Sequence, residues 1–116
     1  MAYALMILEP HGQRAARGEA EGRKRYEQMV RFSEELKERC LLTLAQSLKS
    51  DNEGVRLRMG AAEPSIVDGP FAESKEMIGG FFVLTCEHRD QAISIARQCP
   101  ALGWATVEVR ELGPCF

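Results

Sequence analysis

The sequence predicts a single α+β domain in which an antiparallel sheet carries helices on one face. Strand-like apolar runs lie near the start of the chain, at Tyr3–Glu9, and in its second half, at Gly79–Cys86. Two segments with helical periodicity follow them, at Glu19–Arg39 and His88–Cys99. The chain has 116 residues, a length that suits one domain, so residues 1–116 are assigned to one unit.

Composition and charge exclude several classes of function. The formal net charge is −2, so a generally basic nucleic-acid-binding surface is not expected. Hydrophobic residues make up 45% and charged residues 28%, which are ordinary values for a globular domain. The apolar stretches are far shorter than the roughly 20 residues of a membrane helix. Met1–Leu8 also lacks a preceding basic region, so no export signal is expected. We therefore expect a cytoplasmic protein without direct nucleic-acid or membrane partners.

The cysteine spacing predicts neither a metal site nor a disulfide framework. The four cysteines are Cys40, Cys86, Cys99 and Cys115, and none forms a C-x-x-C pair or fits a zinc-binding pattern. Thiols in a reducing compartment stay unpaired. No metal and no cofactor is predicted.

The first half of the chain begins as strand, loop and long helix. Tyr3–Glu9 is mostly apolar and is expected to be covered on both faces. Pro10–Gly18 is expected as a loop, and Glu19–Arg39 as an amphipathic helix with ion pairs on its exposed side. Cys40–Leu48 is expected as a short strand, either throughout or finishing as a helical turn.

A hairpin is expected next. After a turn at Ser50–Gly54, apolar residues alternate with arginines at Val55–Met59, the pattern of a half-exposed strand. Ser65–Val67 supplies its partner strand, with a turn at Gly60–Pro64 between them. Asp68–Ile78 is expected as a long polar loop.

The second half repeats the strand–helix–strand order. Gly79–Cys86 has the strongest strand character, and the helix at His88–Cys99 is ended by Pro100. Thr106–Leu112 alternates apolar and polar residues and is the last expected strand. Without the inserted hairpin the order is βαββαβ, which is the ferredoxin-like arrangement.

The sheet face without helices is expected to be covered by a second copy of the chain. The side chains assigned to this face are Phe81 or Phe82, Val83, Ile7 and Val107. Together they would form an apolar patch too large to stay exposed. A twofold dimer that places two such sheets face to face removes it.

One segment carries a family resemblance. Residues 67–81 contain Asp68-Gly69-Pro70-Phe71, then Glu73, Lys75 and Glu76, and then Gly79-Gly80-Phe81. This segment resembles the signature of the DGPF proteins, a branch of the YCII-related family, and the resemblance extends over essentially the whole chain. It implies a dimeric α+β barrel. It also implies glycine after the first helix, where this chain has Cys40; a left-handed backbone there would suit cysteine poorly.

The same resemblance suggests a catalytic pair, since the wider family is thought to act through a histidine and an aspartate without a cofactor. Asp68 is therefore assigned as a general base and His11 as its proton-transfer partner, provided that folding brings them together. The alternative role of Asp68 is to shape the turn before Gly-Pro. His88, at a helix start, is expected as a capping or surface residue.

Polar residues near Asp68 are assigned to ligand binding. These are Glu73, Lys75, Glu76 and Arg56, and Lys75 would receive an anionic group. The alternative is a solvated loop with local ion pairs. Arg14, Arg17, Arg23, Lys24 and Arg25 make residues 11–25 locally positive, which indicates either a solubilising surface or a site for an anion or a partner.

Three functions remain open at this level. The preferred one is a small cytoplasmic dimer that binds a small molecule in a cleft near the DGPF loop; the sequence leaves open whether it also transforms it. The alternative is a regulatory interaction module for a sigma-factor-like partner, without catalysis. The third is a scaffold without a ligand. An open cleft with Asp68 facing a second polar residue would favour the first.

The dimer is the first testable prediction. Light scattering at micromolar concentration should give about twice the mass of one chain, because a twofold interface closes on itself. A stable and well-folded monomer would contradict it.

Overall fold

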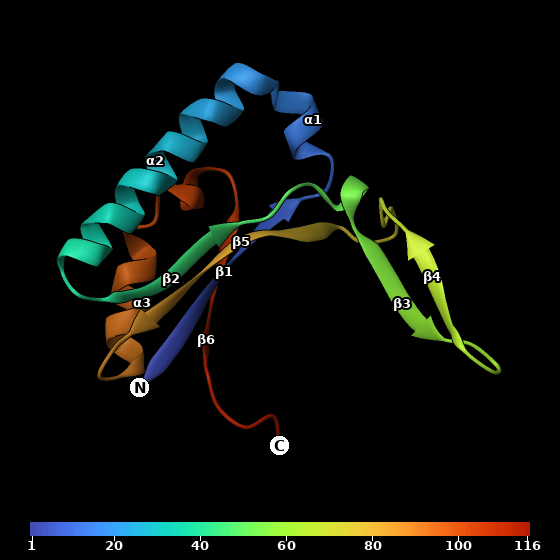
Figure 1. Cartoon of the computed structure of the whole chain (residues 1–116). Helices are drawn as coiled ribbons and strands as arrows, with labels where there is room; N and C mark the ends of the chain where they lie inside the picture. The colour runs from blue at the N-terminus through green and yellow to red at the C-terminus, as the bar shows by residue number, and fades with distance from the viewer.

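The chain forms a four-stranded antiparallel sheet with two long helices on one face (Figure 1), described here from a computed structural model that covers residues 1–116. The strand order is β2-β5-β1-β6, which confirms the ferredoxin-like arrangement. The elements are β1 (Ala2–Pro10), α1 (Gln13–Arg17), α2 (Glu19–Glu38), β2 (Leu42–Ser47), β3 (Val55–Met59), β4 (Pro64–Asp68), β5 (Glu76–Thr85), α3 (Arg89–Arg97) and β6 (Thr106–Glu111), with 3₁₀ turns at Asp51–Glu53 and Pro100–Gly103.

The core lies between the sheet and the two helices. Leu5 of β1 is fully buried, and α2 contributes Phe32 and Leu36 while α3 contributes Ile95. The Phe32 ring meets Phe82 of β5 edge-on, with centroids 5.5 Å apart and planes inclined by 76°. Long apolar side chains at helical spacing therefore seal this face of the sheet.

The second face of the sheet is uncovered within one chain. Along β1 the odd-numbered residues from Tyr3 to Glu9 are buried and the even-numbered ones are half-exposed, so the expectation that both faces of this strand are covered is wrong for one chain. Phe82 is buried while its neighbour Phe81 is half-exposed, as adjacent strand residues point to opposite sides. Ile7 and Val107 are expected on the uncovered face, and both expectations are wrong: Ile7 belongs to the buried core, and Val107, its partner in β6, packs against that core.

Two boundaries differ from the sequence prediction for local reasons. The short helix α1 lies within the segment Pro10–Gly18, which was expected as a loop. It is flanked by Gly12 and Gly18, whose φ angles are 85° and 81°, and two glycines so close together are typical of a loop. Strand β5 begins at Glu76 rather than Gly79, because a bulge after Ile7 lets the end of β1 pair with three more residues. The strand β2 ends at Ser47 without a helical turn.

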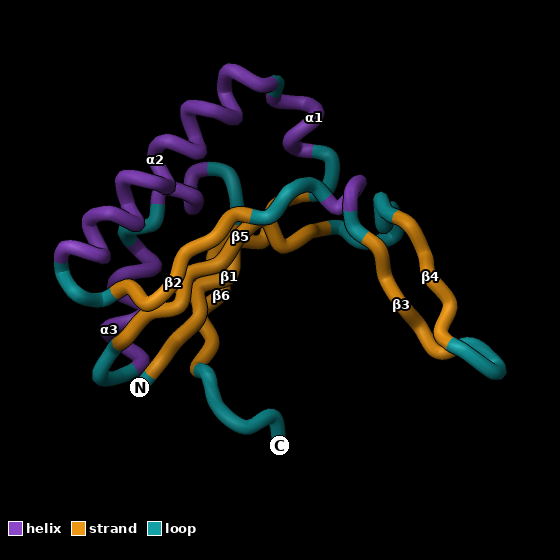
Figure 2. The backbone as a smooth tube through the Cα atoms, viewed as in Figure 1, coloured by secondary structure: helices purple, strands orange, loops and turns teal.

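The hairpin β3–β4 projects from the body of the molecule (Figures 1 and 2). All ten of its residues are exposed, including the large apolar side chains of Leu57, Met59 and Ile66. An isolated two-stranded hairpin is marginally stable in water. The homodimer stays a prediction, and the hairpin adds apolar surface that such a dimer would cover.

Cys40 ends the first long helix in a strained conformation. Its φ is 59°, the left-handed region, and Leu41 N–H donates to Leu36 O at 2.9 Å. This is the position at which the resemblance implies glycine, and the backbone here suits glycine better because a Cβ is penalised in this region.

Replacing this cysteine should therefore stabilise the protein. Cys40→Gly should raise the free energy of unfolding by about 1 kcal/mol. The backbone strain that glycine relieves in the folded state is larger than the conformational entropy cost that glycine adds on folding. The measurement is urea denaturation of the purified variant. Cys115→Gly, in the exposed C-terminal tail, is the control and should change stability by less than about 0.5 kcal/mol. A lower stability for Cys40→Gly would contradict the interpretation.

Candidate functional site

The DGPF segment, residues 68–71, packs against the turn that precedes the hairpin. Gly69 N–H donates to Gly54 O at 2.9 Å, and a Cβ at Gly69 would lie 1.8 Å from Asp51 O. The Gly69–Pro70 peptide bond is cis. Phe71 is buried, and its N–H donates to the Asp51 carboxylate at 3.3 Å. Glycine and phenylalanine of the motif thus have packing roles.

The carboxylate that faces His11 is Asp51. His11 Nε2 and Asp51 Oδ2 are 2.7 Å apart, and His11 N–H donates to Lys75 O. The expected pairing of His11 with Asp68 is therefore replaced by a pairing with Asp51. Asp68 is exposed, and its carboxylate makes no hydrogen bond or ion pair. Sequence reasoning missed Asp51 because it stands in a polar turn cluster, Ser50–Gly54, with no local mark of its partner.

Asp51 is half-buried, and its hydrogen bonds decide its charge. Burial by itself would raise the pKa of the Asp51 carboxyl. The hydrogen bond from His11 and that from the Phe71 N–H, with the nearby charge of Arg56, outweigh burial and hold the pKa below its usual value. This carboxylate therefore stays ionised and ties the end of β1 to the DGPF segment.

The four residues assigned to ligand binding come together only in part. The Arg56 guanidinium lies 3.8 Å from the centroid of the Phe71 ring and 3.6 Å from the Glu73 carboxylate. Arg56 and Glu76 line a shallow hollow together with Asp51 and Phe71, whereas Glu73 and Lys75 do not line it. The catalytic and binding roles of these residues stay predictions.

A second and more enclosed site lies between α2 and the sheet. This pocket has a volume of about 330 Å³. Its apolar wall includes Ile7, Met29, Val30, Phe82 and Trp104. Its charged lining residues are Glu9, Arg14, Arg17 and Arg25. Three of the arginines singled out in the positive stretch, Arg14, Arg17 and Arg25, therefore line this pocket.

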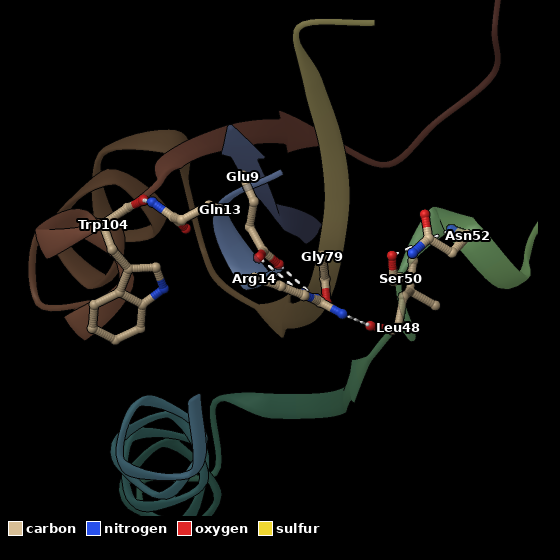
Figure 3. A network of polar contacts seen from close by, with 8 residues as sticks. All are labelled: Glu9, Gln13, Arg14, Leu48, Ser50, Asn52, Gly79 and Trp104. Atoms are coloured by element: carbon tan, nitrogen blue, oxygen red, sulfur yellow. Dashed lines mark hydrogen bonds and ion pairs between the residues drawn. The ribbon is translucent and has the colours of Figure 1, made fainter. Parts of the chain in front are cut away.

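A buried ion pair forms one end of this pocket (Figure 3). Glu9 is 5% exposed, and Arg14 donates to both of its carboxylate oxygens, from Nε at 2.9 Å and from Nη2 at 2.6 Å. Arg14 Nη1 also donates to Leu48 O at 2.7 Å, and Nη2 to Gly79 O at 3.2 Å. With both of its oxygens accepting from one guanidinium, this carboxylate fixes the position of Arg14.

The double glycine of β5 is explained by two close contacts, that of Gly79 with this ion pair and that of Gly80 with the backbone of β2. A Cβ at Gly79 would lie 1.4 Å from Glu9 Oε2, and one at Gly80 would lie 3.0 Å from Gln46 O. The expectation of a close backbone approach at Gly79–Gly80 is confirmed. Only a residue without a side chain at position 79 leaves room for the carboxylate.

A family model described as the YCII-related domain matches residues 1–115. The chain belongs to the YCII-related family. An uncharacterised protein of Rhizobium meliloti (strain 1021) is 42% identical over 60 residues, which are 48% of this chain and 47% of that protein. The matched part therefore spans about half the length of that relative. Assignment to the DGPF branch within the family stays a prediction.

A solved structure with the same fold is that of an enzyme. The 5-chloro-2-hydroxyhydroquinone dehydrochlorinase of Burkholderia phenoliruptrix AC1100, in complex with 2,5-dihydroxybenzoquinone, matches with a TM-score of 0.57 and 16% identity. The match covers 97% of this chain and 94% of that one. At this identity the likeness establishes the fold, which is the one predicted for the family.

Two further observations concern the whole chain. No helix has the length and apolar character needed to cross a membrane. No group of three or more histidine, cysteine or acidic side chains is arranged to hold a metal ion.

The Asp51 contacts predict how stability responds to acid. Because the folded-state pKa lies below the unfolded value of about 3.9, Asp51 contributes stability above that pH, and the contribution is lost as pH falls through the folded-state pKa. Asp51→Asn should be less stable than the wild type at pH 7, and the difference should shrink below about pH 4.

Urea denaturation between pH 3 and pH 7 measures this difference, with Asp68→Asn as the matched control. Since the Asp68 carboxylate makes no contact, that variant should follow the wild type. An equal loss of stability in both variants would refute the role given to Asp51.

Proposed function

We propose that this protein binds a small organic molecule in the pocket between α2 and the sheet. The observation that carries the proposal is an enclosed pocket of about 330 Å³ whose lining combines apolar side chains with a small set of charged groups. Ligand sites in proteins have this combination of an apolar wall and a few fixed polar groups.

The buried pair of Glu9 and Arg14 supports a functional pocket. Burying the Glu9 carboxylate costs several kcal/mol before its attraction to the quarter-exposed Arg14 is counted, so the ion pair is a weak device for stability alone. Here it lies at the pocket wall and requires a glycine at position 79. The family and fold support the same reading, since a YCII-like fold also serves a dehydrochlorinase solved with a dihydroxybenzoquinone.

A second candidate function is proton transfer at the pair of His11 and Asp51. Their 2.7 Å contact is half-buried, with 23% of the His11 and 14% of the Asp51 side chain exposed. A histidine exchanges protons near neutral pH, and a carboxylate on one ring nitrogen sets its orientation. In this candidate Asp51 orients His11 and takes the place of Asp68, which the sequence analysis had assigned as the general base paired with His11. The sigma-factor-like partner stays a prediction without a contact in this structure.

Trp104 provides a direct test of the pocket. It is the only tryptophan in the chain and lines the pocket, so its fluorescence reports on the occupant. Titration with a panel of small quinols, phenols and aromatic acids should give a saturable change in fluorescence for at least one compound. The same compound should raise the melting temperature, because binding to the folded state stabilises it.

Two matched serine variants place the binding site. Ser33→Leu fills part of the pocket from α2 and should abolish both signals, whereas Ser94→Leu, exposed on α3, should retain them. His11→Gln and Asp68→Asn should also retain them if the ligand occupies this pocket. A panel without any binding compound, or a compound that still binds Ser33→Leu, would overturn the proposal.

A further inference from the structure

The charges around the pocket are unbalanced toward the positive. Three arginines and one glutamate line it, and the glutamate forms an ion pair with Arg14. The two remaining arginines, Arg17 and Arg25, lie at the helical side of the pocket. Arg25 pairs with Glu21 at 3.3 Å, whereas Arg17 makes no ion pair, so the pocket keeps the positive charge of Arg17 beside an apolar wall, which favours an anionic occupant.

Arg17 reaches the pocket from the end of α1 and lacks a partner for a buried donor. Its Nε atom is buried and makes no hydrogen bond. Its guanidinium lies against Gly22 of α2, where a Cβ would come within 3.2 Å of Nε. Glycine within a helix costs about 1 kcal/mol relative to alanine, and its placement here leaves space for this guanidinium.

The surroundings of Arg17 disfavour its charge in the free protein. Burial is the largest influence and lowers the pKa of the Arg17 guanidinium, while Glu9 acts in the opposite direction. Arginine nevertheless stays protonated in proteins. A negative group beside it would offset the cost of this burial.

Arg25 presents a second unpartnered donor at the same pocket. Its guanidinium carbon lies 5.1 Å from the centroid of the Trp104 ring. Its Nε donates to Glu21 at a long 3.3 Å, and its Nη1 is buried without a hydrogen bond. The Trp104 carbonyl accepts a 2.8 Å hydrogen bond from Gln13, which anchors this residue to the start of α1.

We propose that the ligand of this pocket is an aromatic carboxylate, with its carboxylate on Arg17 and Arg25 and its ring against Trp104 and the apolar wall. This inference rests on the proposed function and names its ligand class. The planar fork of donors on a guanidinium matches the two oxygens of a carboxylate. The protein leaves one donor of each guanidinium buried and unpaired, Nε of Arg17 and Nη1 of Arg25, so a carboxylate beside them would supply acceptors that the chain itself does not provide.

Three probes with one ring and different charge test the ligand class. Benzoate should quench or shift Trp104 fluorescence saturably. Benzamide, a neutral molecule of the same shape, should bind at least about tenfold more weakly, since charge-assisted hydrogen bonds are about twice as strong as neutral ones. Phenyl phosphate is the control for the kind of anion, because a guanidinium pairs with phosphate as well as with carboxylate, and it should bind no more tightly than benzoate.

Arginine variants locate the carboxylate. Arg17→Gln and Arg25→Gln should each weaken benzoate binding at least about tenfold. Arg23→Gln is the matched control, since Arg23 lies in the same helix but its side chain is 75% exposed and pairs with Glu19. Circular dichroism checks that each variant folds; if one does not, the comparison of benzoate with benzamide on the wild type decides the matter alone.

The outcomes separate this inference from the proposed function. Equal binding of benzoate and benzamide, tighter binding of phenyl phosphate, or no benzoate binding at all would overturn the carboxylate class. If another compound of the panel still binds the wild type and not Ser33→Leu, the proposed function stands without it. Benzoate binding that survives in both Arg17→Gln and Arg25→Gln also refutes the inference.

Discussion

The buried pair of Glu9 and Arg14 is the contact on which the rest of this structure depends. Glu9 lies at the end of the central strand β1, and Arg14 lies in α1, so the pair fixes how the chain leaves the sheet. Arg14 also donates to the carbonyl of Leu48, which follows β2, and to the carbonyl of Gly79, which belongs to β5. One guanidinium thus joins three parts of the sheet to the first helix, and its removal would leave a buried carboxylate unpaired, a change that costs about 3–5 kcal/mol.

This ion pair also shapes the pocket. It requires Gly79 in β5, because any Cβ there would overlap the carboxylate. By fixing α1, it places Arg17, the last residue of that helix, beside Gly22 of α2, which leaves room for the guanidinium. The ion pair between Glu9 of β1 and Arg14 of α1 therefore positions the Arg17 guanidinium opposite the apolar wall of the pocket around Trp104.

Asp51 plays a similar part for the projecting hairpin. Its carboxylate accepts from Phe71 N–H and faces His11, so the DGPF segment is held to the end of β1. Gly69 and Phe71 are explained by this packing, whereas Asp68 has no contact that explains it. Within the YCII-related fold, the motif thus has a structural part at Gly69 and Phe71, and its acidic residue is left for a role outside the fold of one chain.

The sequence by itself determined the strands, the two long helices and their βαββαβ order. Periodicity is a local property, and it was sufficient for Glu19–Glu38 and for the hairpin strand Val55–Met59, whose observed bounds lie within one residue of those predicted. The double glycine also indicated a close approach at Gly79–Gly80, although the contacting residues, Glu9 and Gln46, are distant in the sequence. The family resemblance, and not periodicity, pointed to the left-handed residue that follows α2.

Only the tertiary structure decided which side chains meet. His11 and Asp51 are 40 positions apart, and Gln13 and Trp104 are 91 apart, so no local pattern could pair them. The bulge after Ile7 lengthened β5, and the packing of α1 and α2 against the sheet decided which arginines of the positive stretch line a pocket. Partner choice depends on the register and crossing of distant elements, and that is set when the whole core packs.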